Sequence, residues 1–287
     1  MNIGNVLRFL KDEFVYGGHL LSLGAVSIVF TAAVLLGIAV TWDFLVLAYL
    51  TSYIPYSYNR LVELKEDYLT NPARTEHIKA GIHILPAVIV LSFLAAIVIS
   101  IRYGNPASSI FEIGMVIGSL FYSIHFKDYT RRIIGFKSLY VSFFWASLIF
   151  LMALYYRYYA IVPVFITFFF VFLRFIVSTV FFDIKDIRSD MLHGLKTLPV
   201  FFGKKRVLSL LHYLNAISFF PILIGIIVGA LPLVSLALII FWYYSYYYLE
   251  LIKRRNSVNI QKLSYIMVDG EYVLWAVAVY LLNSYPW

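Results

Sequence analysis

Residues 160–183 read AIVPVFITFFFVFLRFIVSTVFFD, and this stretch decides the fold class. Arg174 is its one charged residue before the final Asp183. A helix that crosses the hydrocarbon core of a bilayer needs about 20 mainly apolar residues at a rise of about 1.5 Å each. The apolar run is continuous rather than alternating, which favours a helix over a strand of a membrane barrel. We therefore predict that this stretch is a membrane-spanning helix.

Eight further stretches of the same kind follow one another along the chain. With ends uncertain by several residues, they are 14–39, 44–64, 80–101, 107–127, 137–156, 206–229, 231–251 and 266–284. Overall, 62% of the residues are hydrophobic and 13% are charged, whereas a soluble domain has roughly 45–50% apolar and 25% charged residues. No polar interval is long enough for a soluble domain. The sequence predicts an all-α integral membrane protein, with nine transmembrane helices in one membrane domain of residues 1–287.

The basic residues indicate how these helices are oriented. Nearly all of them flank the N-terminus and the ends of the even-numbered spans, and the opposite ends carry little beyond Arg102 and Arg157. The positive-inside rule then places the N-terminus in the cytoplasm, most simply at the cell membrane. The net charge of +8 is thus interpreted as a topology signal, and no nucleic-acid partner is expected.

A first group of acidic residues lies at the cytoplasmic end of span two. Residues 58–75 read YNRLVELKEDYLTNPART and place Asn59, Glu63 and Asp67 four residues apart. If the helix continues, this spacing puts the three side chains on one face. Taken alone, such a group is equally typical of a helix end that meets water.

A second group lies at the end of span six, where residues 181–203 read FFDIKDIRSDMLHGLKTLPVFFG. Asp183, Asp186 and Asp190 again share a helical face. Two sets of carboxylates at one membrane face repel each other unless a positive charge lies between them. Oxygen ligands without cysteine suit Mg²⁺, which shares its coordination between carboxylates and substrate phosphates. Because Asn59 and Asp183 both close an even-numbered span, we also expect two four-helix halves plus a last helix around a central cavity.

These residues resemble the two signatures of the UbiA-type prenyltransferase superfamily, and the resemblance covers nearly the whole chain. The first signature is matched by Asn59, Glu63, Asp67, Asn71, Pro72 and Arg74, and the second by Asp183, Asp186, Asp190, His193, Gly194, Thr197, Leu198, Pro199 and Gly203. A weaker match joins Tyr122 and Ser123 to Arg132 and the Gly135-Phe136-Lys137 segment. Two residues depart from the pattern: Glu63 replaces the usual Asp, and Thr75 replaces a frequent Pro.

The resemblance implies an enzyme that transfers an isoprenyl group from a polyprenyl diphosphate to a lipophilic acceptor, aromatic or lipid, within the membrane. It implies Mg²⁺ as the cofactor, which would assist ionisation of the diphosphate. The implied metal ligands are Glu63, Asp67, Asp183, Asp186 and Asp190, and the implied catalytic residues are Tyr122, Lys137 and Arg132. Asn59, Arg74, Arg174 and Lys196 are expected to bind substrate. The active site is expected to face the cytoplasm.

Several of these residues have a second interpretation. Arg132 and its neighbour Arg131 are also typical of a solvated basic pair, and Arg174, deep in span six, needs either a carboxylate or the diphosphate as its partner. Asp269 and Glu271 are expected at a solvated helix start, with Asp269 as a candidate for the rim of the site. Two other functions remain open, a cation-coupled carrier and a non-catalytic protein that binds prenyl lipids.

Overall fold

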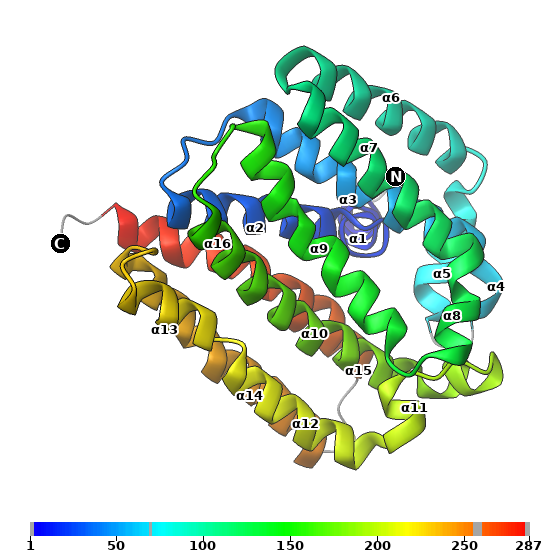
Figure 1. Cartoon of the computed structure of the whole chain (residues 1–287). Coiled ribbons are helices and arrows are strands. Elements are labelled where there is room, and N and C mark those ends of the chain that lie inside the picture. Colours follow the sequence, from blue (N-terminus) through cyan, green and yellow to red (C-terminus); the bar gives the residue numbers. More distant parts are fainter. Residues whose placement is uncertain (1–2, 69–70, 255–259, 285–287) are drawn as a thin grey trace.

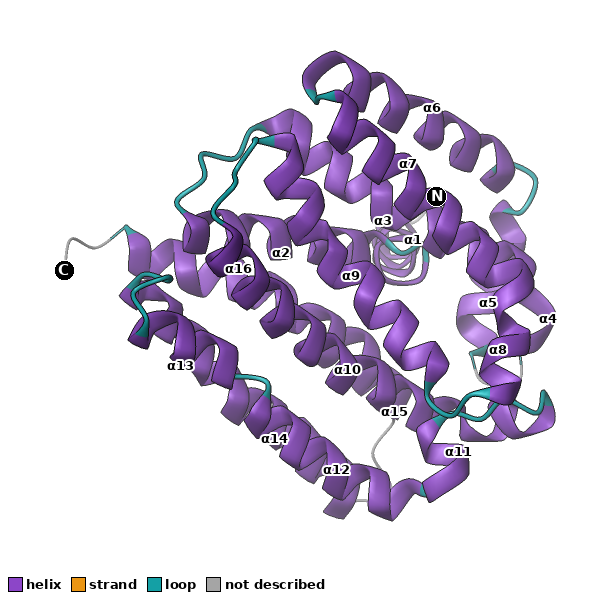
Figure 2. Cartoon of the chain, viewed as in Figure 1, coloured by secondary structure: helices purple, strands orange, loops and turns teal. Residues whose placement is uncertain are grey.

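The computed structural model is built from helices (Figures 1 and 2) and describes residues 3–68, 71–254 and 260–284. No strand occurs in these ranges, as the sequence predicted. In chain order the elements are α1 (Ile3–Tyr16), α2 (His19–Leu36), α3 (Trp42–Val62), α4 (Leu64–Asp67), α5 (Pro72–Gly81), α6 (Leu85–Tyr103), α7 (Pro106–Phe121), the π-helical η1 (Tyr122–Phe126), α8 (Lys127–Arg132), α9 (Phe136–Tyr155), α10 (Ile161–Leu192), α11 (Leu198–Phe202), α12 (Lys204–Ile217), α13 (Phe220–Ile227), the 3-10 helical η2 (Leu233–Ile239), α14 (Ile240–Arg254), α15 (Ile260–Leu263), the π-helical η3 (Ser264–Val268) and α16 (Asp269–Asn283).

Seven helical segments of the described chain are long and apolar enough to cross a membrane. They are His19–Leu36, Leu85–Tyr103, Pro106–Ile124, Phe136–Tyr155, Ile161–Leu192, Lys204–Ile227 and Ser264–Asn283. Each coincides with one of the nine expected spans. The protein is thus a multi-pass, all-helical membrane protein.

The other two expected spans are less apolar or less regular. Helix α3 has 21 residues, but it carries buried polar side chains, including Thr51, Ser52 and Ser57. The stretch expected at 231–251 is divided between η2 and α14, and α14 alone has 15 residues. The first expected span also starts later than residue 14, because Gly18 adopts a left-handed φ of 89° between α1 and α2. A Cβ at Gly18 would lie 2.3 Å from Cδ1 of Tyr56.

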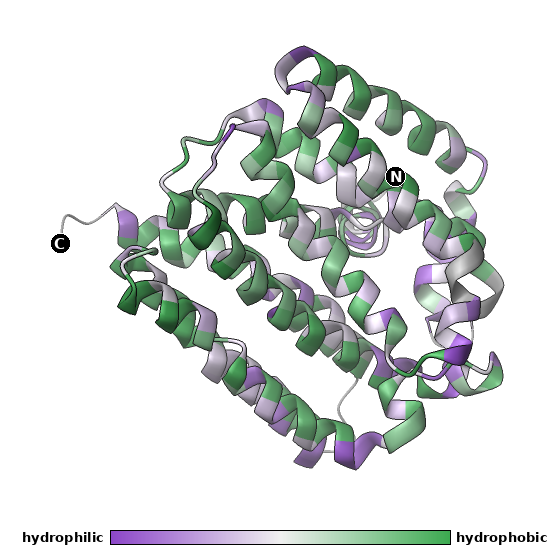
Figure 3. Ribbon diagram, viewed as in Figure 1, coloured by the Kyte–Doolittle hydropathy of each residue, from purple (hydrophilic) through white to green (hydrophobic). Residues whose placement is uncertain are grey.

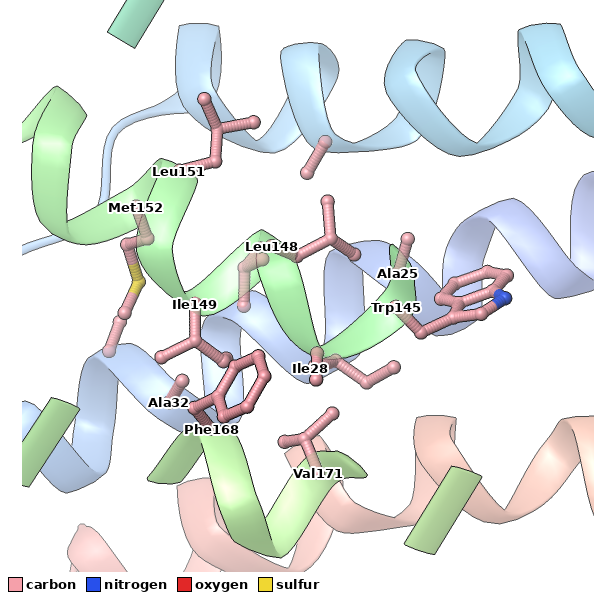
Figure 4. Packing of buried hydrophobic residues seen from close by; sticks show 14 of the residues in the cluster. Ala25, Ile28, Ala32, Trp145, Leu148, Ile149, Leu151, Met152, Phe168 and Val171 are labelled. Carbon is pink, nitrogen blue, oxygen red and sulfur yellow. The ribbon is translucent and has the colours of Figure 1, made fainter. Parts of the chain in front are cut away.

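Helix α10 runs through the middle of the molecule, with α9 on one side and α12 and α13 on the other (Figure 1). Helix α16 packs along α2, so the last helix returns to the first membrane helix. The main apolar cluster lies between α2, α3, α9, α10 and α16. Figure 4 shows part of it, including Ile28, Leu148, Ile149 and Val171.

Hydrophilic residues gather at the end of the bundle where α4, α5, α8 and α11 lie (Figure 3). The same end holds the C-terminal part of α10, which continues without a break to Leu192. Asp183, Asp186 and Asp190 are therefore carried on one rigid helix, as their spacing predicted. The fold brings both acidic groups to this polar end.

Candidate active site

A cavity of about 300 Å³ lies among α2, α3, α9, α10 and α16 and is capped by the segments between the membrane helices. Most of the residues selected from the sequence line it. They are Asn59, Glu63, Asp67, Arg74, Tyr122, Lys137, Asp183, Asp186 and Asp190. The two acidic groups, which are more than a hundred residues apart in sequence, thus face one space.

The first acidic group stays on one face although α3 formally ends at Val62. Backbone hydrogen bonds from Glu63 N to Asn59 O and from Asp67 N to Glu63 O, both 2.9 Å, carry the helical spacing across the junction with α4. The Asn59 amide donates to Glu63 Oε2 over 2.8 Å. The prediction that Asn59, Glu63 and Asp67 share one helical face is therefore confirmed.

Asp67 is held by two arginines. Its Oδ2 lies 2.7 Å from Arg60 Nη1 and 3.0 Å from Arg74 Nη2, and its side chain is 14% exposed. Burial by itself would raise the pKa of Asp67, but the charges of Arg60 and Arg74 outweigh it and lower the pKa to about 2. The carboxylate is ionised throughout the physiological pH range.

The second acidic group is held by lysines. Lys137 Nζ lies 2.8 Å from Asp183 Oδ1 and 3.7 Å from Asp190 Oδ1. Ser138 donates to Asp183 Oδ2 over 2.7 Å, so the buried Asp183 is satisfied on both oxygens. Lys185 Nζ lies 3.3 Å from Asp186 Oδ1.

A chain of contacts through Lys185 joins the two groups. Lys185 Nζ donates to Asn71 Oδ1 over 3.1 Å, and the Tyr265 hydroxyl donates to the same oxygen over 2.5 Å. The guanidinium of Arg74 lies 5.6 Å from the centre of the Tyr265 ring, within the range of a cation–π contact. The cap that carries Asn71 and Arg74 is thereby tied to α10.

The loop after α10 positions Lys137. Gly135 donates its N–H to Lys196 O, and Lys196 donates its N–H to Thr130 O, both over 2.9 Å. Gly135 has a φ of 72°, a conformation that favours glycine, and it directly precedes α9. These bonds join the Gly135-Phe136-Lys137 segment to the segment after Asp190.

Tyr122 begins η1 and lines the cavity. Its ring stacks on Tyr140, with 4.7 Å between ring centroids and an interplanar angle of 11°. The π-helical turn places Tyr122 and Ser123 together on the cavity wall, so the pair that the sequence singled out acts as one surface.

The residues at the polar end fit Mg²⁺ in their chemistry. All candidate ligands offer oxygen, and the buried Oδ1 of Asn59 has no hydrogen-bond partner. Within the described residues, no three Asp, Glu or His side chains are grouped closely enough to hold a metal by themselves. A site of this kind suits an ion that takes one or two carboxylates and completes its coordination with water and substrate phosphates.

The family model for the UbiA prenyltransferase family matches residues 20–268. The chain belongs to this family. The resemblance recognised from the motifs is confirmed, and with it the predicted class of activity, intramembrane prenyl transfer. Nothing in the comparisons supports the carrier or the non-catalytic binder. A comparison with curated proteins gave no match.

Solved structures of UbiA homologues share the fold. The apo structure of a UbiA homologue from Aeropyrum pernix K1 has a TM-score of 0.73 at 14% identity, over 91% of this chain and 98% of that one. A UbiA homologue from Archaeoglobus fulgidus, described as bound to DMAPP and Mg²⁺, has a TM-score of 0.64 at 15% identity, over 96% and 100%. A digeranylgeranylglyceryl phosphate synthase structure has a TM-score of 0.61 at 15% identity, over 95% and 99%.

Three of the predicted site residues do not line the cavity of this UbiA family member: Arg132, Lys196 and Arg174. The side chains of Arg132 and Lys196 are exposed. Arg131, also exposed, lines the cavity in place of its neighbour Arg132 and donates from Nε to His193 O over 3.2 Å. Lys196 contributes its backbone instead. Helical periodicity explains the first difference, since neighbouring residues on α8 point about 100° apart.

Arg174 pairs with a carboxylate rather than facing the diphosphate end. It forms a buried ion pair with Glu271 and donates to Asn215 Oδ1 over 2.5 Å and to Ser245 Oγ over 2.5 Å. The expectation that Glu271 starts a solvated helix is wrong, because its side chain is 2% exposed. Its partner lies on a different helix, which hydropathy along the sequence cannot reveal.

Two cationic residues of the cavity wall, Arg60 and Lys185, were not among the predicted site residues. Arg60 directly follows Asn59, and Lys185 lies between Asp183 and Asp186. Their positions inside the acidic signatures were the available signal. Asp269, named as a candidate for the rim, does line the cavity.

Proposed function

We propose that the protein transfers an isoprenyl group from a polyprenyl diphosphate to a lipophilic acceptor within the membrane, with Mg²⁺ assisting loss of the diphosphate. One observation carries the proposal: two acidic groups and their paired cations meet at the polar end of a cavity that continues between apolar helices. The diphosphate would lie at the polar end and the isoprenyl tail in the apolar part. The Archaeoglobus homologue described with DMAPP and Mg²⁺ and a second description of it with GPP and Mg²⁺ support this arrangement.

Mg²⁺ would be held by Glu63 and Asp67 on one side and by Asp183, Asp186 and Asp190 on the other. When bound, the ion neutralises charge that develops on a leaving diphosphate. Asn59 would contribute its unpartnered amide oxygen below the first group. The longer side chain of Glu63 still reaches the end of Asn59, which supports its place among the ligands.

The paired cations would exchange partners when substrate enters. Lys137 neutralises the buried Asp183 and Lys185 the half-buried Asp186, and a carboxylate in a low-dielectric site requires a positive neighbour. With Mg²⁺ held by these carboxylates, Lys137 and Lys185 would be available to phosphate oxygens as point charges, and Arg74 and Arg60 as forks. This exchange would keep the site electrically balanced with and without substrate.

The wall below the diphosphate position would protect the allylic cation. Tyr122 presents a ring at the boundary between the polar and apolar parts of the cavity, and the negative face of an aromatic ring stabilises a nearby cation. Exclusion of water by the helices would prevent its capture by hydrolysis.

The acceptor would be a lipophilic aromatic compound or a lipid that reaches the cavity from the membrane. The apolar helices that surround the cavity support this class, and the match to a digeranylgeranylglyceryl phosphate synthase fold is compatible with it. The basic residues at the polar end are accounted for by membrane topology and by diphosphate, so no nucleic-acid partner is proposed.

We further propose the finer architecture expected from the sequence. Helix α3 and the η2–α14 segment would complete nine spans, in two four-helix halves plus α16, within one domain of residues 1–287. The N-terminus and the polar end of the cavity would face the cytoplasm, at the cell membrane. The basic residues near that end support this orientation.

The test is product formation by the purified protein with Mg²⁺, radiolabelled geranylgeranyl diphosphate and geranyl diphosphate, and a panel of lipophilic acceptors. We expect labelled product with at least one acceptor, lost with EDTA and in Asp183→Asn. Asp128→Asn is the matched control, because Asp128 is exposed, pairs with Arg131 and is not among the residues that line the cavity. Absence of both product and released diphosphate for every donor, from a folded protein, would contradict the proposal.

A further inference from the structure

The inner end of the cavity is closed by three stacked aromatic rings from three different helices. Trp145 of α9 stacks on Phe175 of α10, with 4.8 Å between ring centroids and 9° between the planes. Phe175 stacks in turn on Tyr272 of α16, at 4.4 Å and 6°. The Tyr272 hydroxyl and Ser178 Oγ lie 2.5 Å apart, which fixes the third ring. All three rings line the cavity.

The stack lies well below the acidic groups. Trp145 and Phe175 lie on the same helices as Lys137 and Asp183, about 12 Å further along the axis at 1.5 Å per residue. On each of these two helices, the ring is the cavity-lining residue furthest from the polar end. On α16 the same is true of Tyr272, which lies one turn beyond Asp269.

The space beneath the rings is filled. One turn further from the polar end, Ile149 of α9, Val171 of α10 and Trp275 of α16 are all at most 2% exposed, and none of them lines the cavity. Figure 4 shows Trp145 at the end of the labelled cluster, with Leu148, Ile149 and Val171 continuing away from it. The stack is therefore a floor with packed side chains behind it.

The opposite side of the cavity is built differently. Besides the polar Asn59 and Arg60, its lining residues on α2 and α3 are Leu21, Ser52, Pro55 and Tyr56. Of these, Tyr56 is aromatic and lies one turn from Asn59, towards the polar end. A closed aromatic floor beneath a diphosphate site limits how far an extended tail can reach in that direction. Protein interiors are packed so closely that removal of one ring either leaves a cavity or lets neighbouring side chains collapse into its place.

We propose that the stack of Trp145, Phe175 and Tyr272 is the floor of the isoprenyl pocket and sets the longest donor that binds with its tail fully enclosed. This inference rests on the proposed function, because it takes the tail to enter from the diphosphate end. Phe175 is the central ring and contacts both others, so its side chain determines the depth of the pocket. Removal of the Phe175 ring extends the pocket towards Val171.

The experiment measures the Kd of non-hydrolysable geranyl, farnesyl and geranylgeranyl thiolodiphosphates with Mg²⁺ in wild type, Phe175→Ala and Phe170→Ala. Phe170 is the matched control: it lies on α10, is 1% exposed and packs on Phe219 and Trp275, away from the cavity. In wild type, affinity should increase with tail length up to one of the three donors and should not increase further for a longer one. In Phe175→Ala we expect affinity to increase up to the next longer donor. The ratio of the affinity for the longer donor to that for the shorter one should rise at least about tenfold, the size of effect that a few methylene groups exert in an apolar pocket.

An unchanged length profile in folded Phe175→Ala, or an equal shift in Phe170→Ala, would overturn the inference while leaving the proposed function intact. If wild type binds no donor in the presence of Mg²⁺, both this inference and the proposed function are contradicted. Should Phe175→Ala not fold, Phe175→Leu keeps a branched apolar side chain without the ring and carries the same expectation. Tyr272→Phe keeps the ring and should leave the position of the length limit where it is.

Discussion

Lys137 Nζ lies 2.8 Å from Asp183 Oδ1 although the residues are 46 positions apart in sequence, and Asp183 is 1% exposed. The loop after α10 and the glycine before α9 bring the two together. This pair joins the motif at the end of span six to the weaker motif before span five. It also makes each residue depend on the other for its charge balance.

Replacing Lys137 should therefore damage both stability and turnover. Lys137→Met leaves the Asp183 carboxylate buried without its cation, which in comparable sites costs roughly 3–5 kcal/mol. We expect a lower unfolding temperature and a kcat reduced by about 100-fold, the size of effect of losing a positioned charge in a reaction site. Lys137→Arg keeps the charge and should recover most of the stability. Wild-type turnover in Lys137→Met would show that this lysine does not serve the reaction.

Replacement of Lys185 should change substrate and metal binding more than stability, because this residue connects the cap to α10. Its side chain is 3% exposed and contacts Asn71 and Asp186. In Lys185→Met we expect donor KM to rise about tenfold and Mg²⁺ to bind more tightly, because the metal no longer competes with the lysine for Asp186. Titration with Mn²⁺ followed by electron paramagnetic resonance measures the second effect without turnover. Weaker Mn²⁺ binding in the variant would contradict the exchange of cations for metal.

Asp67 should contribute stability that disappears in acid. Its ordinary pKa of 3.8 applies to the unfolded chain, and in the folded protein the pKa is about 2. The contribution is present at pH above 3.8 and is lost as the pH falls through 2. With about 1.4 kcal/mol per pKa unit, it amounts to about 2 kcal/mol. Unfolding in detergent should thus show a steeper loss of stability between pH 4 and pH 2 for wild type than for Asp67→Asn. Identical pH profiles would remove the basis for the Arg60–Asp67–Arg74 network.

The buried pair of Arg174 and Glu271 should act on stability and leave the site alone. Glu271→Gln leaves the Arg174 charge uncompensated among α10, α12 and α16, and we expect a loss of roughly 3–5 kcal/mol. The double variant Arg174→Met with Glu271→Leu removes both charges and should be more stable than either single variant. Thermal unfolding of the three variants measures this. A double variant that is less stable than both single ones would show that the pair itself stabilises the fold.

The sequence was sufficient to predict an all-helical, multi-pass membrane protein because continuous apolar runs are a local property. It also identified the two acidic groups, since residues four apart on a helix share a face whatever the rest of the chain does. Partners on other helices could not be predicted in this way. Arg174 with Glu271, and Lys185 with Asn71, meet only after the bundle closes.

The sequence placed Arg132 and Lys196 less well for a related reason. Both lie in short segments between membrane helices, where a shift of one residue turns a side chain from the cavity to solvent. Arg131 lines the cavity where Arg132 was expected, and Lys196 contributes backbone hydrogen bonds to Gly135 and Thr130 instead of its side chain. The aromatic stack could not be predicted from the sequence either, because packing between helices, and not spacing along the chain, determines which of the many aromatic rings meet.

The most direct measurement is an experimental structure with Mn²⁺ and a prenyl thiolodiphosphate, in which anomalous scattering locates the metal. We predict metal density between the group of Glu63 and Asp67 and the group of Asp183, Asp186 and Asp190, with the diphosphate bridging them and Lys137 turned towards its oxygens. Metal and diphosphate bound elsewhere, with the Lys137–Asp183 and Arg74–Asp67 pairs intact, would contradict the central claim that these two groups form the diphosphate site.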